Sequence, residues 1–310
     1  MINFEVPRGA CDCHVHIFDP VRFPYVAKRV YTPPEALIEN LTELQTALRM
    51  DRVVIVQPSV YGADNSCTLD AVSKLGTRAR AVVVIDKDTS QTEIDDMAAA
   101  GVRGIRLNLN TTPNGEVDAD GSKRTLDRAV EQIEGRGWHI QFYTRPHVIA
   151  GLKTHIEQLP FPVVFDHFGA AQAVDGPSQH GFDALLDLVK SGRAYVKVSG
   201  AYRTSNKSPD FPDALPLAQA LIAANADRVV WGTDWPHPDS AFGRGRPLTD
   251  IAPPFPVDDA LLLNQLPKWA PDPAVRENIL VHNAARLYGF EAADSQAQPD
   301  RLISLNFGVA

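Results

Sequence analysis

The chain has 310 residues, of which 22% are charged and 44% are hydrophobic, which are ordinary proportions for a globular protein. Its formal net charge of −8 argues against nucleic acid or an anionic membrane surface as a partner. Three cysteines are too few for a disulfide framework, no apolar run approaches the roughly 18 residues of a membrane span, and the opening residues, MINFEVPRGA, do not resemble a signal peptide, so we expect a soluble cytoplasmic protein.

Short runs rich in β-forming residues recur along the chain, at residues 10–18, 51–57, 79–86, 101–109, 138–144, 162–169, 194–200 and 228–235. Segments with helical character lie between them. In residues 33–50, leucines spaced three or four residues apart mark one apolar face, and residues 122–137 open with a serine and close on a glycine. Strand and helix alternating eight times predict a (β/α)8 TIM barrel, and a doubly wound open sheet is the alternative.

Two regions fall outside this alternation. Residues 236–270 form a proline-rich insertion after the eighth predicted strand, and residues 291–310 form a polar tail. We therefore expect one barrel domain over residues 1–290, followed by a C-terminal tail over 291–310. The sequence gives no indication of the oligomeric state.

The first predicted strand carries an unusual set of polar residues. Because strand side chains alternate, Asp12, His14 and His16 are expected to share one face. Cys11 and Cys13 would then take the other face, toward the helical shell, and pack there as small buried hydrophobes. A cysteine-based zinc site would need more cysteines than the chain has.

Polar residues also end several later apolar strands. They are Arg106 with Asn108, Gln141 with Tyr143, Asp166 with His167, Lys197 with Ser199, and Asp234. In a barrel the carboxyl ends of the strands form the mouth, where active sites are built. We expect His14, His16, His167 and Asp234 to converge there, and Lys197 to be buried and paired. A non-catalytic barrel that only binds a metabolite or a partner is a further alternative, and it has no need of this combination.

Several motifs along the chain resemble the amidohydrolase superfamily. They are CDCHVHIFDP, AGVRGIRLN, FDHFG and WGTDWPHP, and the likeness extends over roughly residues 7–291. More narrowly, the chain resembles the branch of lactone hydrolases typified by 2-pyrone-4,6-dicarboxylate lactonase. The resemblance implies a hydrolase that opens the ring of a small carboxylated lactone in the breakdown of aromatic compounds or sugar acids. The substrate would be a 2-pyrone-4,6-dicarboxylate-like, muconolactone-type or sugar-acid lactone.

The resemblance also implies roles for individual residues. Asp234 would be the general base that activates water, and the imidazoles of His14, His16 and His167 would surround the scissile carbonyl and stabilise the oxyanion. The positions that hold the substrate in this branch are matched here by Arg106, Tyr143, Arg203, Tyr31 and Ser59.

The resemblance leaves the question of a metal open. The wider superfamily usually completes a dinuclear site with a lysine on the fourth strand and a histidine on the fifth, and neither stands at the matching inward positions here. We therefore expect catalysis without a cofactor. The alternative is a single divalent ion such as zinc on His14, His16 and Asp234, since tetrahedral zinc accepts two histidines and a carboxylate. With such an ion, a zinc-dependent decarboxylase of the same superfamily, acting on a small aromatic or unsaturated acid, is the competing function.

The chain departs from this branch in one respect. In its relatives a further basic residue follows the GVRG-x-R motif, whereas here no lysine or arginine occurs between Arg106 and Lys123. A second group that binds the substrate's anionic part could come from elsewhere, and the candidates are Arg145, His147, Arg244 and Arg246. The last two lie in a GRGRP loop within the insertion, which is either a solvated loop or a lid over the mouth.

Overall fold

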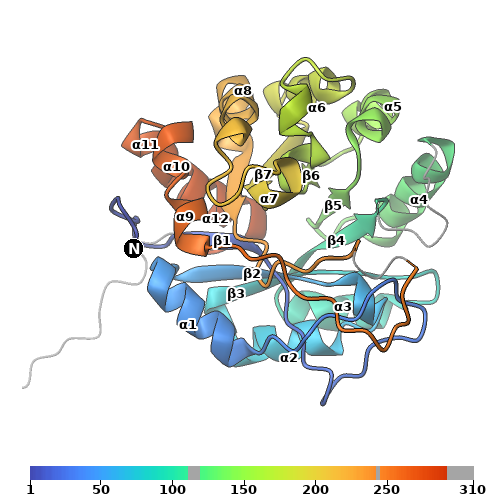
Figure 1. The fold of residues 1–310 in the computed structure, drawn as a ribbon. Helices are drawn as coiled ribbons and strands as arrows, with labels where there is room; N and C mark the ends of the chain where they lie inside the picture. Colours follow the sequence, from blue (N-terminus) through green and yellow to red (C-terminus); the bar gives the residue numbers. More distant parts are fainter. Residues whose placement is uncertain (111–118, 242–244, 292–310) are drawn as a thin grey trace, which may run out of the picture.

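A single parallel sheet forms the centre of the computed structural model, which describes residues 1–110, 119–241 and 245–291 (Figure 1). Its eight strands follow one another in sequence order, and each pairs in parallel with the next. The strands are β1 (Cys11–Val15), β2 (Arg52–Val56), β3 (Ala79–Val83), β4 (Val102–Asn108), β5 (His139–Tyr143), β6 (Val163–Phe165), β7 (Ala194–Ser199) and β8 (Val229–Gly232).

The two ends of the sheet meet and close it into a barrel. Immediately after β8, the amide of Asp234 donates to the carbonyl of His14 over 2.9 Å, and the amide of His16 donates to the carbonyl of Trp235 over 2.8 Å. The prediction of a (β/α)8 barrel is thereby confirmed. An open doubly wound sheet is excluded, because its outermost strands would not meet.

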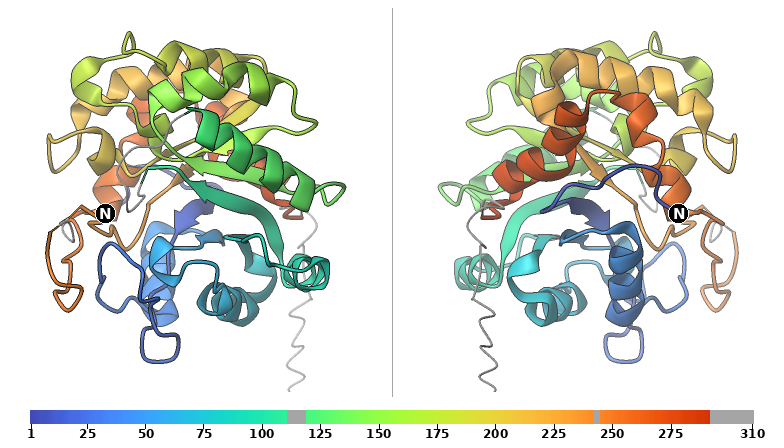
Figure 2. Two further views of the ribbon diagram at one scale, coloured as in Figure 1. Left: turned by 90° about the vertical axis from the view of Figure 1, so that its right-hand side faces the viewer. Right: turned by 90° about the vertical axis from the view of Figure 1, so that its left-hand side faces the viewer.

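Helices surround the strands. Figure 1 shows α1, α2 and α3 on one side of the strands and α5, α6 and α8 on the other, and the side views in Figure 2 agree. The longer helices are α1 (Ile38–Leu48), α2 (Ser66–Leu75), α3 (Gln91–Ala99), α4 (Ala119–Gln132), α5 (Pro146–Glu157), α6 (Phe182–Lys190) and α8 (Leu215–Asn225). The shorter ones are α7 (Ala201–Thr204), α9 (Asp259–Leu263), α10 (Leu266–Trp269), α11 (Pro273–Glu277) and α12 (Asn283–Tyr288). No helix within the described ranges is both long and apolar enough to cross a membrane.

The strands separate two apolar clusters because their side chains alternate. The outer cluster packs between strands and helices and contains Val53, Ile55 and Val229, among others. The inner cluster contains the alternate residues Val54, Val56 and Val230, together with Tyr288 at the end of α12. The inside of the barrel is therefore a packed core and not a pore.

The predicted orientation of the two cysteines is wrong. Cys11 and Cys13 belong to the inner cluster, not to the helical shell. The pairing of β1 with β2 changes register between Asp12 and Val15, and such a bulge breaks the strict alternation of sides. As a result, the side chains of the consecutive residues Cys13 and His14 both lie inside the barrel. The side chain of Asp12 instead binds Thr233, through the backbone amide over 3.0 Å and the hydroxyl over 2.6 Å.

The proline-rich segment 236–270 returns to the loop that follows β1. The amide of Ala252 donates to the carbonyl of Thr32 over 2.7 Å, and α9 and α10 lie at the end of the segment. Residues 242–244 of this segment lie outside the described residues, as does the predicted tail from residue 292 onward.

Candidate active site

The structure brings together the four residues predicted to meet at the mouth. His14 and His16 come from the end of β1, His167 follows β6, and Asp234 follows β8. The Nε2 atoms of His14 and His16 each lie 3.6 Å from Oδ1 of Asp234, and Nε2 of His167 lies 3.7 Å from its Oδ2. All four side chains are almost fully buried. A carboxylate surrounded by three imidazoles therefore forms the floor of the mouth.

Two of these residues hold an unusual backbone conformation. Asp234 has φ of 66° and His167 has φ of 48°, both in the left-handed region that residues other than glycine rarely adopt. Such a conformation costs on the order of 1–3 kcal/mol and persists only where the surroundings impose it. Here the barrel closure fixes Asp234, because its amide is bonded to the carbonyl of His14. In this conformation the two side chains face each other, with Nε2 of His167 3.7 Å from Oδ2 of Asp234.

Two neighbouring residues on α7 hold one oxygen of the Asp234 carboxylate. The hydroxyl of Tyr202 donates to Oδ2 over 2.6 Å, and Nε of Arg203 donates to the same atom. Burial alone would raise the pKa of Asp234, but the Arg203 guanidinium and the nearby imidazoles hold it well below its usual value. The carboxylate is therefore ionised at neutral pH, with Oδ1 left for other partners.

Hydrogen-bond partners assign the proton on His16. Its Nδ1 lies 2.7 Å from the carbonyl of Val56, which only accepts, so Nδ1 carries the proton and Nε2 is a lone pair that faces Oδ1 of Asp234. Nδ1 of His14 lies 3.2 Å from Oδ1 of Asp166, an acceptor, and 3.3 Å from Nζ of Lys197, a donor, so its partners allow either tautomer. Nε2 of His16 and Oδ1 of Asp234 are both acceptors, and a water molecule or a metal ion between them would satisfy both.

His167 has the opposite arrangement. Its Nδ1 lies 2.9 Å from the hydroxyl of Ser199, which is able to donate to it. Nε2 of His167 lies 3.7 Å from Oδ2 of the Asp234 carboxylate, and that negative charge favours the tautomer with the proton on Nε2, where it serves as a donor beside the cavity. Burial lowers the pKa of His167 to about 4, so the ring is neutral at physiological pH.

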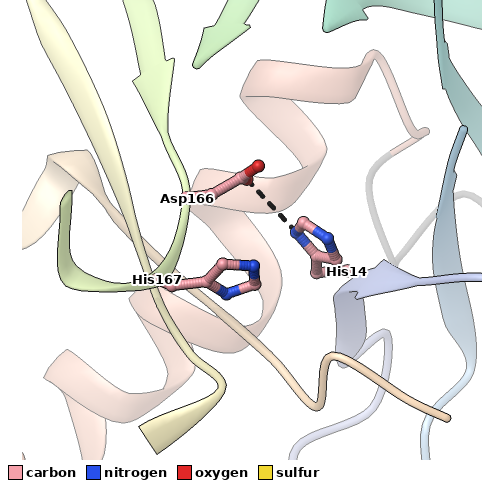
Figure 3. A group of neighbouring side chains, drawn as sticks. All are labelled: His14, Asp166 and His167. Carbon is pink, nitrogen blue, oxygen red and sulfur yellow. Dashed lines mark ion pairs between the residues drawn. The ribbon is translucent and has the colours of Figure 1, made fainter. Parts of the chain in front are cut away.

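Asp166, which sequence reasoning did not single out as a site residue, connects two parts of the site. Its Oδ1 lies 3.2 Å from Nδ1 of His14, and its Oδ2 accepts from Nε of Arg106 over 3.1 Å, with Nη2 of Arg106 at the same distance. Figure 3 shows Asp166 facing the His14 ring, with His167 from the same segment beside them. Its direct neighbour His167 carried the sequence signal, whereas the partners of Asp166 come from β1, β4 and β7 and are distant in the chain.

Lys197 on β7 is buried and paired, as predicted. Its Nζ donates to the carbonyl of Cys13 over 2.9 Å and to Oε1 of Gln141 over 2.8 Å, and it lies 3.5 Å from Oδ1 of Asp166. Burial lowers the pKa of this lysine, although Asp166 opposes the shift. A buried charge of this kind is tolerated because it is paired and hydrogen-bonded.

A small cavity opens above the carboxylate, and we name it the reaction cavity. Its free volume is about 30 Å³, which corresponds to one water molecule. All five residues predicted to bind substrate line it, although Arg203 also holds Asp234. Pro238 and Ser240 show that the insertion forms part of its wall. The lining residues are His16, Tyr31, Pro58, Ser59, Arg106, Asn108, Tyr143, His167, Arg203, Asp234, Pro238 and Ser240.

The candidates for a second anion-binding group lie further out. Arg145 and His147 line a larger outer cavity, at the start of α5. Arg246 is exposed on its loop, and Arg244 lies outside the described residues. Nothing in the described part of this loop shows whether it closes over the mouth, so its role as a lid stays a prediction.

The donor set at the floor fits a single divalent ion. His14, His16 and Asp234 present ligand atoms within 4.8 Å of one another, and Nε2 of His14 and Oδ1 of Asp234 are buried without a hydrogen-bond donor among the described residues. His14, Asp166 and His167 form a second group at the same spacing, but there Arg106 and Lys197 already balance the Asp166 charge. The first group is the better match to zinc chemistry.

Comparisons with known proteins agree with this geometry. The family model described as "Amidohydrolase" matches residues 11–290. The chain is 35% identical over 290 residues to 4-sulfomuconolactone hydrolase of Rhizobium radiobacter, covering 93% of this chain and 92% of that protein. It is 31% identical over 291 residues to D-galactarolactone isomerase of Agrobacterium fabrum, covering 92% and 93%. A solved Pseudomonas putida protein assigned as a 2-pyrone-4,6-dicarboxylic acid hydrolase superposes with a TM-score of 0.72 at 29% identity, covering 92% of this chain and 99% of that one. The chain therefore belongs to the amidohydrolase family.

Proposed function

We propose that the protein is a hydrolase that opens the ring of a small lactone bearing an acidic group. The observation that carries this proposal is the ionised Asp234, whose Oδ1 faces Nε2 of His14 and Nε2 of His16 at the floor of a cavity edged by Arg106. The names of its relatives support the same chemistry, because each acts on a lactone. The competing decarboxylase is not favoured by these relatives.

The side chains supply a complete set of groups for hydrolysis. A water molecule beside Oδ1 of Asp234 gives up a proton to the carboxylate and attacks the lactone carbonyl. Nε2–H of His167 donates to the oxyanion that develops on the carbonyl oxygen. The ring C–O bond then breaks, and the proton held by Asp234 passes to the departing ring oxygen. One water and one lactone yield one hydroxy acid, or its keto tautomer where the ring oxygen leaves as an enol.

Arg106 is suited to bind the acidic group of the substrate. Its Nε and Nη2 are engaged by Asp166, whereas Nη1 makes no hydrogen bond to any other described residue. The ring of Tyr143 lies below the guanidinium, 5.2 Å from its carbon to the ring centroid, and fixes its plane. Tyr31 lies on the cavity wall as a neutral donor, because burial raises its pKa to about 12.

We propose that Asp234 and the imidazoles carry out this chemistry without a required metal, and a single zinc is the alternative. His14, His16 and Asp234 would hold the ion. When bound, zinc would polarise the lactone carbonyl and make its attacking water more acidic. In either case Arg106 binds the acid group and His167 donates to the oxyanion.

The test is a panel of carboxylated lactones, including muconolactone and 2-pyrone-4,6-dicarboxylate. Acid release followed by pH, with the product identified by NMR, distinguishes three reactions: a hydroxy acid or its keto form indicates hydrolysis, a rearranged lactone isomerisation, and carbon dioxide decarboxylation. We expect the ring-opened acid. A chelator together with metal analysis decides the cofactor: complete loss of activity that zinc restores would overturn the metal-independent mechanism.

A further inference from the structure

The side chain of Lys197 lies inside the barrel in contact with His14, and the proposed reaction gives it no role. Its fully buried Nζ donates to the carbonyl of Cys13 over 2.9 Å and to Oε1 of Gln141 over 2.8 Å. An ammonium group has three protons and no lone pair, so one proton remains for a third acceptor. Nδ1 of His14 lies 3.3 Å from Nζ in hydrogen-bonding geometry. Because Nζ can only donate, this contact requires Nδ1 to accept.

Asp166 is the competing partner of the same nitrogen. Its Oδ1 lies 3.2 Å from Nδ1 of His14 (Figure 3) and 3.5 Å from Nζ of Lys197. The contact with His14 is close but is not aligned as a hydrogen bond, since Oδ1 is buried without a hydrogen-bond partner among the described residues. The third proton of Lys197 faces both acceptors and allows them to lie side by side. The geometry therefore favours the tautomer of His14 that has its proton on Nε2.

The other ring nitrogen of His14 faces the general base. Nε2 lies 3.6 Å from Oδ1 of Asp234, and both atoms are buried with no hydrogen-bond partner in the described part of the chain. This separation is longer than a formed hydrogen bond, as is common in an active site without substrate. His14 is fully buried and is not one of the residues that line the reaction cavity, so its Nε2 acts on the carboxylate and not on the substrate. A proton on Nε2 would hold Oδ1, just as Tyr202 and Arg203 hold Oδ2.

The two tautomers of His14 correspond to the two candidate mechanisms. Zinc would take the lone pair of Nε2, which requires the ring proton to be on Nδ1 and to be donated to a carboxylate such as that of Asp166. Lys197 opposes this arrangement, because Nζ has no lone pair to accept from Nδ1 and because its charge lies beside the ligand. The lysine therefore favours an active site without a metal ion on His14.

We propose that Lys197 is a positioning residue: it donates to Nδ1 of His14, keeps the ring proton on Nε2, and so directs a hydrogen-bond donor at the carboxylate of Asp234. The same contact disfavours zinc on His14. The effect on catalysis rests on the proposed lactone hydrolysis, whereas the tautomer and the effect on zinc binding do not depend on it. Lys197 acts through His14 and does not touch the substrate.

Nitrogen-15 NMR of metal-free protein with labelled histidines reads the tautomer directly, because a protonated ring nitrogen and a bare one differ widely in chemical shift. The signals of His14 are identified by their loss in His14→Gln. We expect the wild type to carry the proton on Nε2, and Lys197→Met to carry it on Nδ1, where Asp166 is the remaining acceptor. A proton on Nδ1 in the wild type would overturn the proposal, even if Lys197→Met does not fold. The same tautomer in the wild type and in a folded Lys197→Met would also overturn it.

Calorimetric titration of metal-free protein with zinc gives a second readout. Lys197→Met loses a neighbouring positive charge and frees the lone pair of Nε2, so we expect it to bind zinc at least about tenfold more tightly than the wild type. Lys190→Met is the matched control: it removes the same charge from an exposed position at the end of α6 and should bind zinc like the wild type. Equal affinities in all three proteins, or equally tighter binding in both variants, would contradict a local effect of Lys197 on His14.

Steady-state kinetics in the presence of a chelator connects this contact to the proposed reaction. We expect Lys197→Met to lower kcat about tenfold or more and to leave KM within about twofold, because the groups that bind the substrate are unchanged. A loss confined to KM would contradict the positioning role. If no lactone is opened but the tautomer and zinc binding respond as expected, the proposed function fails and the role of Lys197 toward His14 stands. If lactones are opened and His14 of the wild type carries its proton on Nδ1, this inference fails and the function stands.

Discussion

Asp234 is the general base of the proposed reaction. Replacing one oxygen of its carboxylate by an amide nitrogen tests this role. Asp234→Asn keeps the size of the side chain but removes the base, so we expect kcat to fall a hundredfold or more while KM changes little. Steady-state kinetics on a lactone that the wild type opens, with a thermal melt to confirm folding, would measure this. Asp70→Asn, on the surface beside Arg22, is the control and should behave like the wild type. Retention of most of the turnover by Asp234→Asn would show that another group activates water.

Asp166 makes substrate binding and catalysis depend on each other. Because one of its oxygens binds Arg106 and the other binds His14, we expect Arg106→Met and Asp166→Asn each to raise KM and to lower kcat. In the double variant the losses should be smaller than their sum, with a coupling of about 1–3 kcal/mol in kcat/KM, because the two residues form one network. Additive losses would mean that the contact between them does not contribute to the reaction.

Individual site residues could be predicted from the sequence, but the contacts between them could not. His14 lies in β1 and His16 directly after it, His167 and Asp234 come after the apolar strands β6 and β8, and their convergence follows from the barrel alone. Asp166 and Tyr202 contact site residues that are distant in the chain. The spacing of residues within a short stretch of sequence cannot predict such contacts. Arg203 was predicted to bind substrate, and the structure adds that its Nε holds Asp234.

At the level of elements, the order of strands and helices was predictable and the details of β1 were not. Eight apolar runs with helices between them determine the barrel. The bulge between Asp12 and Val15 depends on how β1 pairs with its neighbours, so alternation alone misplaced Cys11 and Cys13. The predicted helical segment covers residues 33–50, whereas α1 begins only at Ile38, after Pro33 and Pro34.

The contact between β8 and β1 gives a second kind of test. A Cβ added at Gly232 would lie 2.8 Å from the backbone nitrogen of His14 and 3.0 Å from its Cβ. Neither atom can move without displacing β1, so we expect Gly232→Ala to lower kcat at least tenfold as His14 shifts from Asp234. Gly137→Ala is the control: its Cβ would meet open space, and its φ of +69° should cost stability while kcat is unchanged. Similar kinetic losses in both variants would contradict this explanation.

For the whole molecule, the buried histidines predict how stability depends on pH. Burial lowers the pKa of His139 to about 3, and neither ring nitrogen has a hydrogen-bond partner among the described residues. As pH falls below about 6.5, His139 becomes protonated in the unfolded chain but stays neutral in the folded protein. His139 should therefore cost the folded state up to about 1.4 kcal/mol per pH unit between pH 6 and pH 4.

His139→Gln removes this titration and should flatten the pH dependence of the unfolding free energy over that range. Denaturant titrations at several pH values would measure the slope, and any loss of packing would appear as a constant offset. His282→Gln replaces an exposed histidine and should retain the wild-type slope. Equal slopes for the wild type and His139→Gln would show that His139 is protonated in the folded protein as well.

The shared carboxylate of Asp166 also sets limits on how this enzyme could acquire new substrates. A substitution of Arg106 removes a counter-ion of Asp166 and so disturbs His14. Changing the residue that binds the acidic group of the substrate would therefore also reduce catalysis. The only hydrogen bond given for the Arg145 side chain among the described residues is to Asn110, so this side chain can vary without that penalty. Diversification within this lineage should then proceed through the periphery of the mouth, while the inner arginine stays under constraint as long as the ring-opening step is retained.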